Sequence, residues 1–125
     1  MLPTQRQIQV SRLIRAEISD IIRKEMRDPR LGFVTITDVE ASVDLRHAKV
    51  YVSVLGGEEE ERDAFEAVSG ASAFIRRKLA ERITLKFVPE LHFRLDRTPR
   101  RAARIAMLLQ QVRREGEGEQ SPEPG

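Results

Sequence analysis

Few residues in this chain could do catalytic or metal chemistry. The chain has no cysteine, which excludes disulfides, thiolate nucleophiles and cysteine-ligated zinc, and it has only two histidines, His47 and His92. Neither histidine belongs to a His-Glu-x-x-His motif or has further ligands nearby in the sequence, so both are predicted to be ordinary strand or surface residues. Asp28 and Asp44 could be imagined as an acid and a base, but both lie in polar turn segments, where aspartate commonly bonds to the backbone.

Glycine patterns that hold phosphate groups are also missing from the sequence. The pair Gly56-Gly57 is not followed by Lys-Ser or Lys-Thr, so it predicts the end of a strand rather than a nucleotide-binding loop. We therefore expect no catalytic residue, no metal site and no cofactor, and we do not expect the chain to be an enzyme.

Basic residues are the remaining group with functional information. The net charge of the chain is only +2, but the segment 76–114 holds twelve basic and three acidic side chains. Such a local excess attracts polyanions, and the planar guanidinium of arginine suits phosphate oxygens. The pattern favours a nucleic-acid partner over the alternative of a merely solvated surface.

A run of small residues, Gly70, Ala71, Ser72 and Ala73, interrupts a helical pattern just before the most basic turn. A helix break exposes backbone N–H groups that can bind phosphate, although the small residues could equally serve close helix packing. We expect the basic side chains to converge on one side of the domain. They form two patches, 76–78 and 100–104, and the sequence does not indicate which patch contributes more to binding. The residues expected to contact the nucleic acid are Arg76, Arg77, Lys78, Arg82, Arg97, Arg100, Arg101, Arg104, Arg6 and Arg30.

The first half of the chain predicts one helix and two strands. Thr4 and Gln7 form a capping box, and aliphatic residues then recur at helical spacing until Asp28-Pro29 ends the helix. Segment 33–39 is rich in β-branched residues, and apolar residues alternate with polar ones over 48–54. The short link between them predicts an antiparallel pair.

The second half predicts a broken helix, a strand and a last helix. The acidic run 58–61 starts the broken helix, and segment 84–95 reads as a strand in which Pro89 requires an edge or a bulge. Thr98-Pro99 start the last helix, whose apolar stripe is Ala102, Ile105, Leu108, Leu109 and Val112. The phenylalanines, Phe87 among them, fall mostly at core-like positions. The fold class is therefore α+β: a two-layer sandwich in which helices cover a three-stranded sheet.

The expected domain organisation is simple. Residues 1–5 form an N-terminal extension, 6–114 a single RNA-binding domain and 115–125 a disordered acidic tail. The chain shows no signal-peptide core and no apolar run long enough to span a membrane, so a cytoplasmic location is expected.

Several ordered segments resemble the bacterial ribosome-binding factor A family. They are 27–32 (RDPRLG), 34–37 (VTIT), 44–45 (DL), 48–53 (AKVYVS), 74–80 (FIRRKLA) and 89–96 (PELHFRLD), spread over about residues 6–112. The resemblance implies a type II KH-like domain whose middle helix is kinked at an Ala-x-Gly motif in place of the usual Gly-x-x-Gly loop. Ala71-Ser72-Ala73 falls at that position, so Ala73 replaces the motif glycine.

The resemblance also implies a function. Members of the family bind the free 30S subunit through 16S rRNA and support its late maturation and rRNA processing, particularly in the cold; a monomer without membrane contact is expected. Two alternatives stay open. One is a general KH-like RNA-binding or RNA-chaperone module without subunit preference, and the other is a protein-interaction adaptor that acts through its acidic tail.

Overall fold

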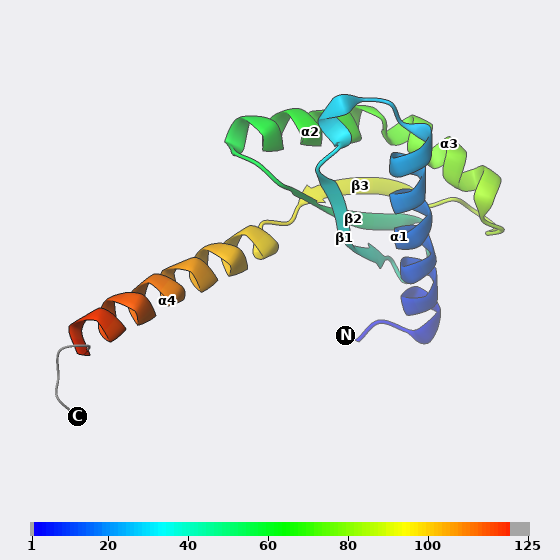
Figure 1. The fold of residues 1–125 in the computed structure, drawn as a ribbon. Coiled ribbons are helices and arrows are strands. Elements are labelled where there is room, and N and C mark those ends of the chain that lie inside the picture. Colours follow the sequence, from blue (N-terminus) through cyan, green and yellow to red (C-terminus); the bar gives the residue numbers. More distant parts are fainter. Residues whose placement is uncertain (1, 121–125) are drawn as a thin grey trace.

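The computed structural model describes residues 2–120, apart from the side chains of Arg100 and of residues 117–120. It contains four α-helices, a 3-10 turn and a three-stranded sheet (Figure 1). In chain order these are α1 (Gln5–Glu25), η1 (Pro29–Leu31), β1 (Val34–Ala41), β2 (His47–Val54), α2 (Glu58–Gly70), α3 (Ser72–Arg82), β3 (Glu90–Leu95) and α4 (Thr98–Gln120).

Helix α1 begins with the predicted capping box. The backbone N–H of Gln7 donates to Thr4 Oγ1 at 3.1 Å, and the N–H of Thr4 donates to Gln7 Oε1 at 2.8 Å. The buried Gln7 side chain also donates to the carbonyl oxygen of Ala41, while Ser11 Oγ accepts from the N–H of Ala41. These bonds fix the start of α1 against the end of β1, and the helix ends at Glu25, shortly before the predicted Asp28-Pro29 boundary.

The sheet has the order β1-β2-β3. Strands β1 and β2 pair antiparallel, as predicted, with a register irregularity between Ile36 and Asp38. Strands β2 and β3 pair parallel, which is possible because the long connection through α2 and α3 returns the chain to the same end of the sheet. The third strand is shorter than predicted, and the buried Pro89 lies just before it, where no ladder donor is needed.

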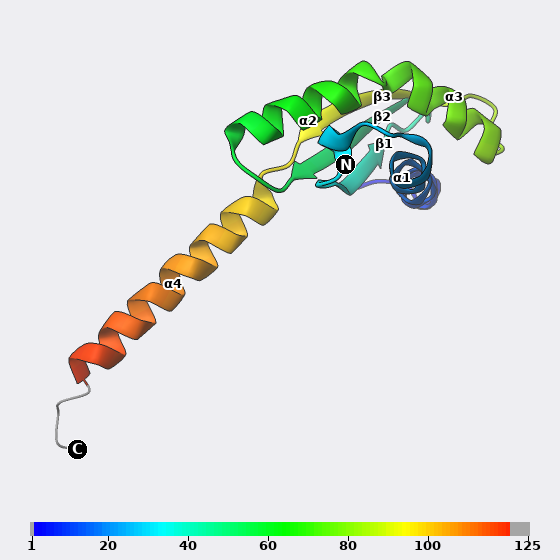
Figure 2. The ribbon, with the colours of Figure 1, turned by 45° about the horizontal axis from the view of Figure 1, so that its top comes forward.

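Helices α1, α2 and α3 cover one face of the sheet and enclose the core (Figures 1 and 2). The fully buried side chains come from both layers: Ile14, Ile18, Ile21, Val50, Val52, Val68, Ile75 and Leu79. The opposite face of the sheet carries the alternate residues of each strand, which are mostly polar. The α+β two-layer prediction is confirmed for this part of the chain.

The long middle helix is broken where the small residues predict a break. Helix α2 ends at Gly70, Ala71 has non-helical backbone angles (φ −94°, ψ 10°), and α3 starts at Ser72. The N–H of Ala71 still bonds to the carbonyl oxygens of Ala67 and Val68, and the ladder of α3 resumes with Ile75 N–H donating to Ala71 at 2.9 Å.

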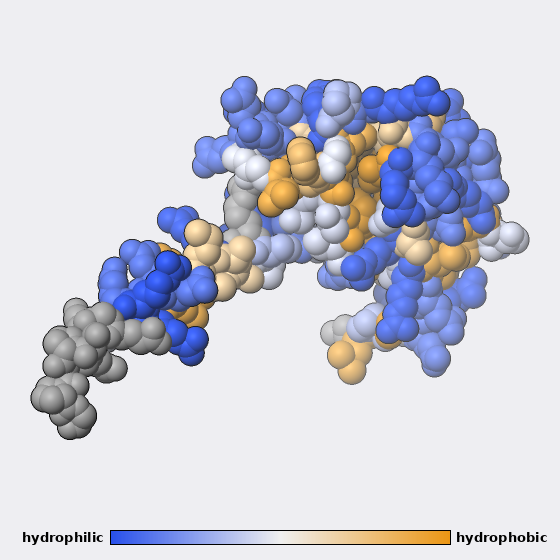
Figure 3. All heavy atoms as spheres, in the orientation of Figure 1, coloured by the Kyte–Doolittle hydropathy of each residue, from blue (hydrophilic) through white to orange (hydrophobic). Residues whose placement is uncertain are grey.

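Helix α4 differs from its prediction. Its apolar stripe was expected to pack against the sheet, but α4 points away from the body of the protein (Figures 1 and 2), and all its residues from 101 to 115 are exposed. Ile105 is 57% exposed and Leu109 65%. In Figure 3 hydrophilic side chains cover much of the helix, with hydrophobic ones at its edges. A stripe at helical spacing predicts an amphipathic helix but does not identify what covers it.

The C-terminal boundary also lies further along than expected. The disordered tail was expected from residue 115, but α4 continues to Gln120, and only residues 121–125 of that segment lie outside the described structure. Among residues 2–120, no helix combines the length and apolar character that crossing a bilayer requires.

Candidate nucleic-acid interface

The basic turn of α3 presents two exposed arginines. Arg76 Nη2 donates to the carbonyl oxygen of Val88 at 2.9 Å, which links the helix to the loop before β3. The guanidinium of Arg77 lies 6.0 Å from the centre of the Phe74 ring and is otherwise open to solvent. Both side chains keep donors available for an added anion, because neither pairs with a carboxylate in the described structure.

Arg82, by contrast, is held by three carboxylates of α1. Its guanidinium lies 2.6 Å from Asp20 Oδ2, 3.0 Å from Glu25 Oε2 and 3.2 Å from Glu17 Oε2. The hydrogen bond from Arg82 lowers the pKa of Asp20 from 3.8 to about 2, and the Asp20 and Glu17 carboxylates raise the pKa of Arg82. This network fastens α3 to α1, so Arg82 has little capacity left for a phosphate.

Three further candidates are also ion-paired. Lys78 Nζ lies 3.7 Å from carboxylate oxygens of both Glu25 and Glu81. Arg97 bonds at 3.0 Å to the buried side chain of Glu61. In the third pair Arg30 binds Asp28 at 2.6 Å, and this contact lowers the pKa of the Asp28 carboxyl.

The remaining candidates lie on the first and last helices, α1 and α4. Arg6 is exposed in the first turn of α1, and Arg101 and Arg104 are exposed on α4; the side chain of Arg100 lies outside the described residues. In Figure 1, α3 lies at one end of the sheet and α4 points away from the opposite end. The expectation that the basic residues converge on one side is therefore wrong, because a charge count along the chain carries no information about direction in space.

A different cluster gathers around Phe87, in the loop between α3 and β3. The Phe87 ring is half exposed, with the Arg46 guanidinium 5.0 Å and the Lys86 ammonium 5.6 Å from its centre. Arg76 reaches the same loop through Val88. We call Arg46, Arg76, Lys86 and Phe87 the loop cluster.

The sequence predicted Phe87 to be a core residue of a longer strand, which is wrong. Because β3 starts only at Glu90, the segment before it is a loop and turns Phe87 outward. Arg46 reaches the loop because the N–H of Glu90 bonds to the carbonyl oxygen of Arg46 at 2.8 Å. The signal that was available is the pair Lys86-Phe87, a cation beside an aromatic residue directly before a proline-containing segment.

The turn aspartates do the backbone chemistry that was predicted for them. Asp28 Oδ1 accepts from the N–H of Arg30 at 2.9 Å, and Asp44 Oδ1 accepts from the N–H of Arg46 at 3.1 Å. The Ser42 hydroxyl and the Arg46 N–H lower the pKa of the Asp44 carboxyl. Asp44 thus orders the turn that carries Arg46 of the loop cluster.

The loop cluster and the start of α3 together offer contacts typical of RNA binding. Guanidinium and ammonium groups neutralise phosphates, and an exposed aromatic ring can stack on an unpaired base. The first-turn N–H groups of α3, at Ser72, Ala73 and Phe74, follow the last N–H of the α2 ladder and have no carbonyl of their own helix to bond to. The arrangement can contact phosphates of an RNA backbone and stack on one base.

Known proteins resemble this chain along most of its length. The sequence model of the family described as ribosome-binding factor A matches residues 6–109. A ribosome-binding factor A from Thermomicrobium roseum is 48% identical over 120 residues, which cover 96% of this chain and 93% of the relative. Another from Halothermothrix orenii is 45% identical over 115 residues, covering 92% and 94%.

Solved structures agree with these matches. The solution structure of a putative ribosome binding factor A from Thermotoga maritima is 36% identical, with a TM-score of 0.64 over 75% of this chain and 90% of that one. The crystal structure of ribosome-binding factor A from Thermus thermophilus gives 27% identity and a TM-score of 0.63 over 71% and 94%. A homology model of the Thermus thermophilus factor, fitted into a cryo-EM map of a 30S–RbfA complex, gives 29% and 0.59 over 69% and 90%. The matched segments, the helix and strand order and the sequence identities establish that this chain belongs to the ribosome-binding factor A family.

Proposed function

We propose that this protein binds the free 30S ribosomal subunit through 16S rRNA and assists late maturation of the subunit and rRNA processing, with a role at low temperature. The observation that carries the proposal is the family match over residues 6–109, together with the related structure fitted into the map of a 30S complex. The protein acts in the cytoplasm, as a monomer and through a KH-like domain.

The docking surface we propose is centred on the loop cluster and the exposed side of α3. Arg46, Arg76 and Lys86 would contact phosphates there, and Phe87 would stack on an unpaired base. Arg77 and the first-turn N–H groups of α3 would offer further donors to phosphates along this helix.

The other predicted contact residues have different prospects. Four of them form ion pairs with carboxylates of the protein, so we assign them a structural role: Lys78, Arg82, Arg97 and Arg30. Arg6, Arg101 and Arg104 are exposed and would add secondary contacts if rRNA extends along α1 or α4. The exposed arginines would act by contacting phosphates, which positions the protein on the rRNA.

Co-sedimentation with purified subunits tests the proposal. The protein should pellet with 30S and not with 50S subunits, and the double variant Arg46→Glu/Lys86→Glu should bind more weakly. Since two cations are lost, the slope of log affinity against log salt should fall by about 1 to 2. Arg62→Glu, which reverses an exposed arginine on α2, is the matched control and should bind like the wild type.

Equal binding to both subunits, or a loop-cluster variant with unchanged affinity, would count against the assignment. The role in maturation has its own test. Cells that depend on this protein should accumulate precursor 16S rRNA in the cold when it is depleted, and the loop-cluster variant should not restore processing.

A second function is favoured by one observation, namely that the contacts of this surface are cations grouped around one exposed aromatic ring, which suit any single-stranded RNA. A general RNA-binding module without subunit preference would need no more than that. Competition with bulk RNA separates the two functions. A general module releases 30S subunits at RNA concentrations that leave a subunit-specific factor bound.

A further inference from the structure

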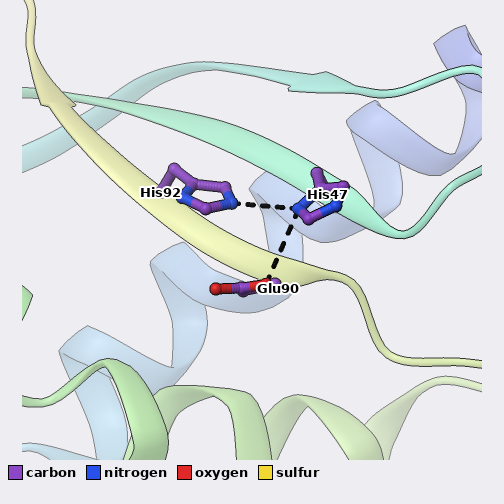
Figure 4. Close-up of side chains that lie close together, drawn as sticks. All are labelled: His47, Glu90 and His92. Carbon is purple, nitrogen blue, oxygen red and sulfur yellow. Dashed lines mark hydrogen bonds and ion pairs between the residues drawn. The ribbon is translucent and has the colours of Figure 1, made fainter.

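Three side chains of types that can ligate a metal converge on the polar face of the sheet, where β2 and β3 begin. His47 Nδ1 lies 3.1 Å from His92 Nε2 and 3.7 Å from Glu90 Oε2 (Figure 4). All three potential donor atoms lie within 4.8 Å of one another. Neither the fold nor the loop cluster accounts for this arrangement.

The register of the sheet sets the arrangement. His47 is the direct partner of Glu90 in the parallel pair β2–β3, and His92 follows Glu90 by two residues, so all three side chains point to the same face. The bond from Glu90 N–H to the carbonyl oxygen of Arg46 locks the strands together at this point. The backbone therefore holds the three side chains in place before any ligand arrives.

The separations fit a shared metal ion as well as they fit a hydrogen bond. A hydrogen bond between the two rings accounts for the 3.1 Å contact, and Glu90 Oε2 lies within ion-pair distance of His47 at 3.7 Å; one shared metal ion would account for both contacts. In a tetrahedral zinc site with metal–nitrogen bonds of about 2.0–2.1 Å, two donors lie about 3.3–3.4 Å apart. The observed separations of 3.1 Å and 3.7 Å lie on either side of that value.

We propose that His47, His92 and Glu90 bind one divalent transition-metal ion of the Zn²⁺ type. Two imidazoles and one carboxylate select zinc, cobalt or nickel over magnesium and calcium, which prefer oxygen ligands. Three protein ligands leave a coordination position open to solvent, because His47 and Glu90 are exposed.

The surroundings of the site shape its affinity. The hollow that contains both histidines is also lined by Lys49, Arg94 and Glu40. The two cations repel a dication and so weaken binding, while they favour a negatively charged fourth ligand. We therefore expect the bound metal to exchange with metal in solution. The folding of the domain should not depend on it.

Zinc titration of the untagged full-length chain, read by competition with a chromogenic chelator, tests the proposal. One Zn²⁺ should bind per chain, and a large excess of Mg²⁺ should not displace it. His47→Asn and His92→Asn should each weaken binding at least about tenfold, and Glu90→Gln several-fold. Glu40→Gln is the matched control, because it removes a carboxylate from the same hollow without removing a proposed ligand, and it should leave the affinity within about twofold.

Imidazole NMR signals give a second readout. The chain has only two histidines, so each ring is assigned by its loss in one variant, and both should shift together as zinc is added. A dissociation constant weaker than about 1 mM, binding that persists in the folded His47→Asn variant, or an equal loss in Glu40→Gln and Glu90→Gln would each overturn the proposal. Far-UV circular dichroism of the metal-free variants confirms that they are folded.

Discussion

Two glycines at the ends of α2 should respond in opposite ways to the same substitution. Gly70 is the last residue of α2, its φ is not positive, and a Cβ added there would meet no atom within 4 Å. Gly56 precedes α2 with φ +131°, and its added Cβ would lie 3.0 Å from Glu60 Cβ. Only the second position requires glycine in the folded structure.

The magnitudes follow from these environments. Alanine at a helical position without a clash is favoured over glycine by about 0.5–1 kcal/mol, so Gly70→Ala should stabilise the protein and raise its Tm by about 2–6 °C. Gly56→Ala should destabilise by about 1–3 kcal/mol, because alanine is strained at that φ and Glu60 must move. The helix break should persist in Gly70→Ala, since the non-helical residue is Ala71.

Urea unfolding followed by circular dichroism measures both variants, and 30S co-sedimentation measures the effect of the substitution at the break on binding. Gly70→Ala should bind 30S like the wild type. If Gly70→Ala destabilises the domain, or if it loses 30S affinity while it stays folded, the break depends on glycine and the open space around Gly70 does not decide which residue is tolerated there. A stable Gly56→Ala variant would contradict the strain assigned to the turn before α2.

Further predictions test the packing and the charges. A chain that ends at Arg97 should unfold at nearly the same urea concentration as the full chain, because residues 101–115 of α4 are exposed; a large loss of stability would mean that α4 packs on the domain in solution. Leu79→Ala should cost about 2–5 kcal/mol in urea unfolding, because this fully buried side chain packs in the core; a cost below about 1 kcal/mol would place it at the surface. The Asp20 pKa is lowered from 3.8 to about 2, so its contribution to stability is complete above pH 3.8 and is lost as the pH falls towards 2. The stability advantage of the wild type over Asp20→Asn should therefore shrink between about pH 5 and pH 2, and a constant difference would exclude this linkage.

Local patterns in the sequence predicted the local structure well. The capping box of Thr4 and Gln7, the alternation of β2 and the small residues around Ala71 each depend on neighbours a few positions away, and each feature is present in the structure. The family was predictable for a related reason, because its motifs keep their order along the chain and the family match covers residues 6–109.

Long-range pairings could not be predicted in the same way. The orientation and register of β3 depend on the crossover through α2 and α3, so nothing in the sequence indicated that His47 and His92 would meet across 45 positions. The same limit applies to α4, whose apolar stripe was predicted correctly as a pattern but wrongly as a buried face.

The strongest sequence signal for function is the excess of positive charge in residues 76–114. Ion pairs with carboxylates elsewhere in the fold reduce the charge that is available to a ligand. Arg82 and Lys78 are neutralised by carboxylates of α1, and Arg97 by Glu61 of α2. The first half of the chain thus supplies the acids that pair with three of the twelve basic residues of 76–114, and it also supplies Arg46 to the loop cluster. Since a phosphate responds to the local field and not to the order of residues along the chain, the docking surface that we propose for RNA draws its cations from both halves.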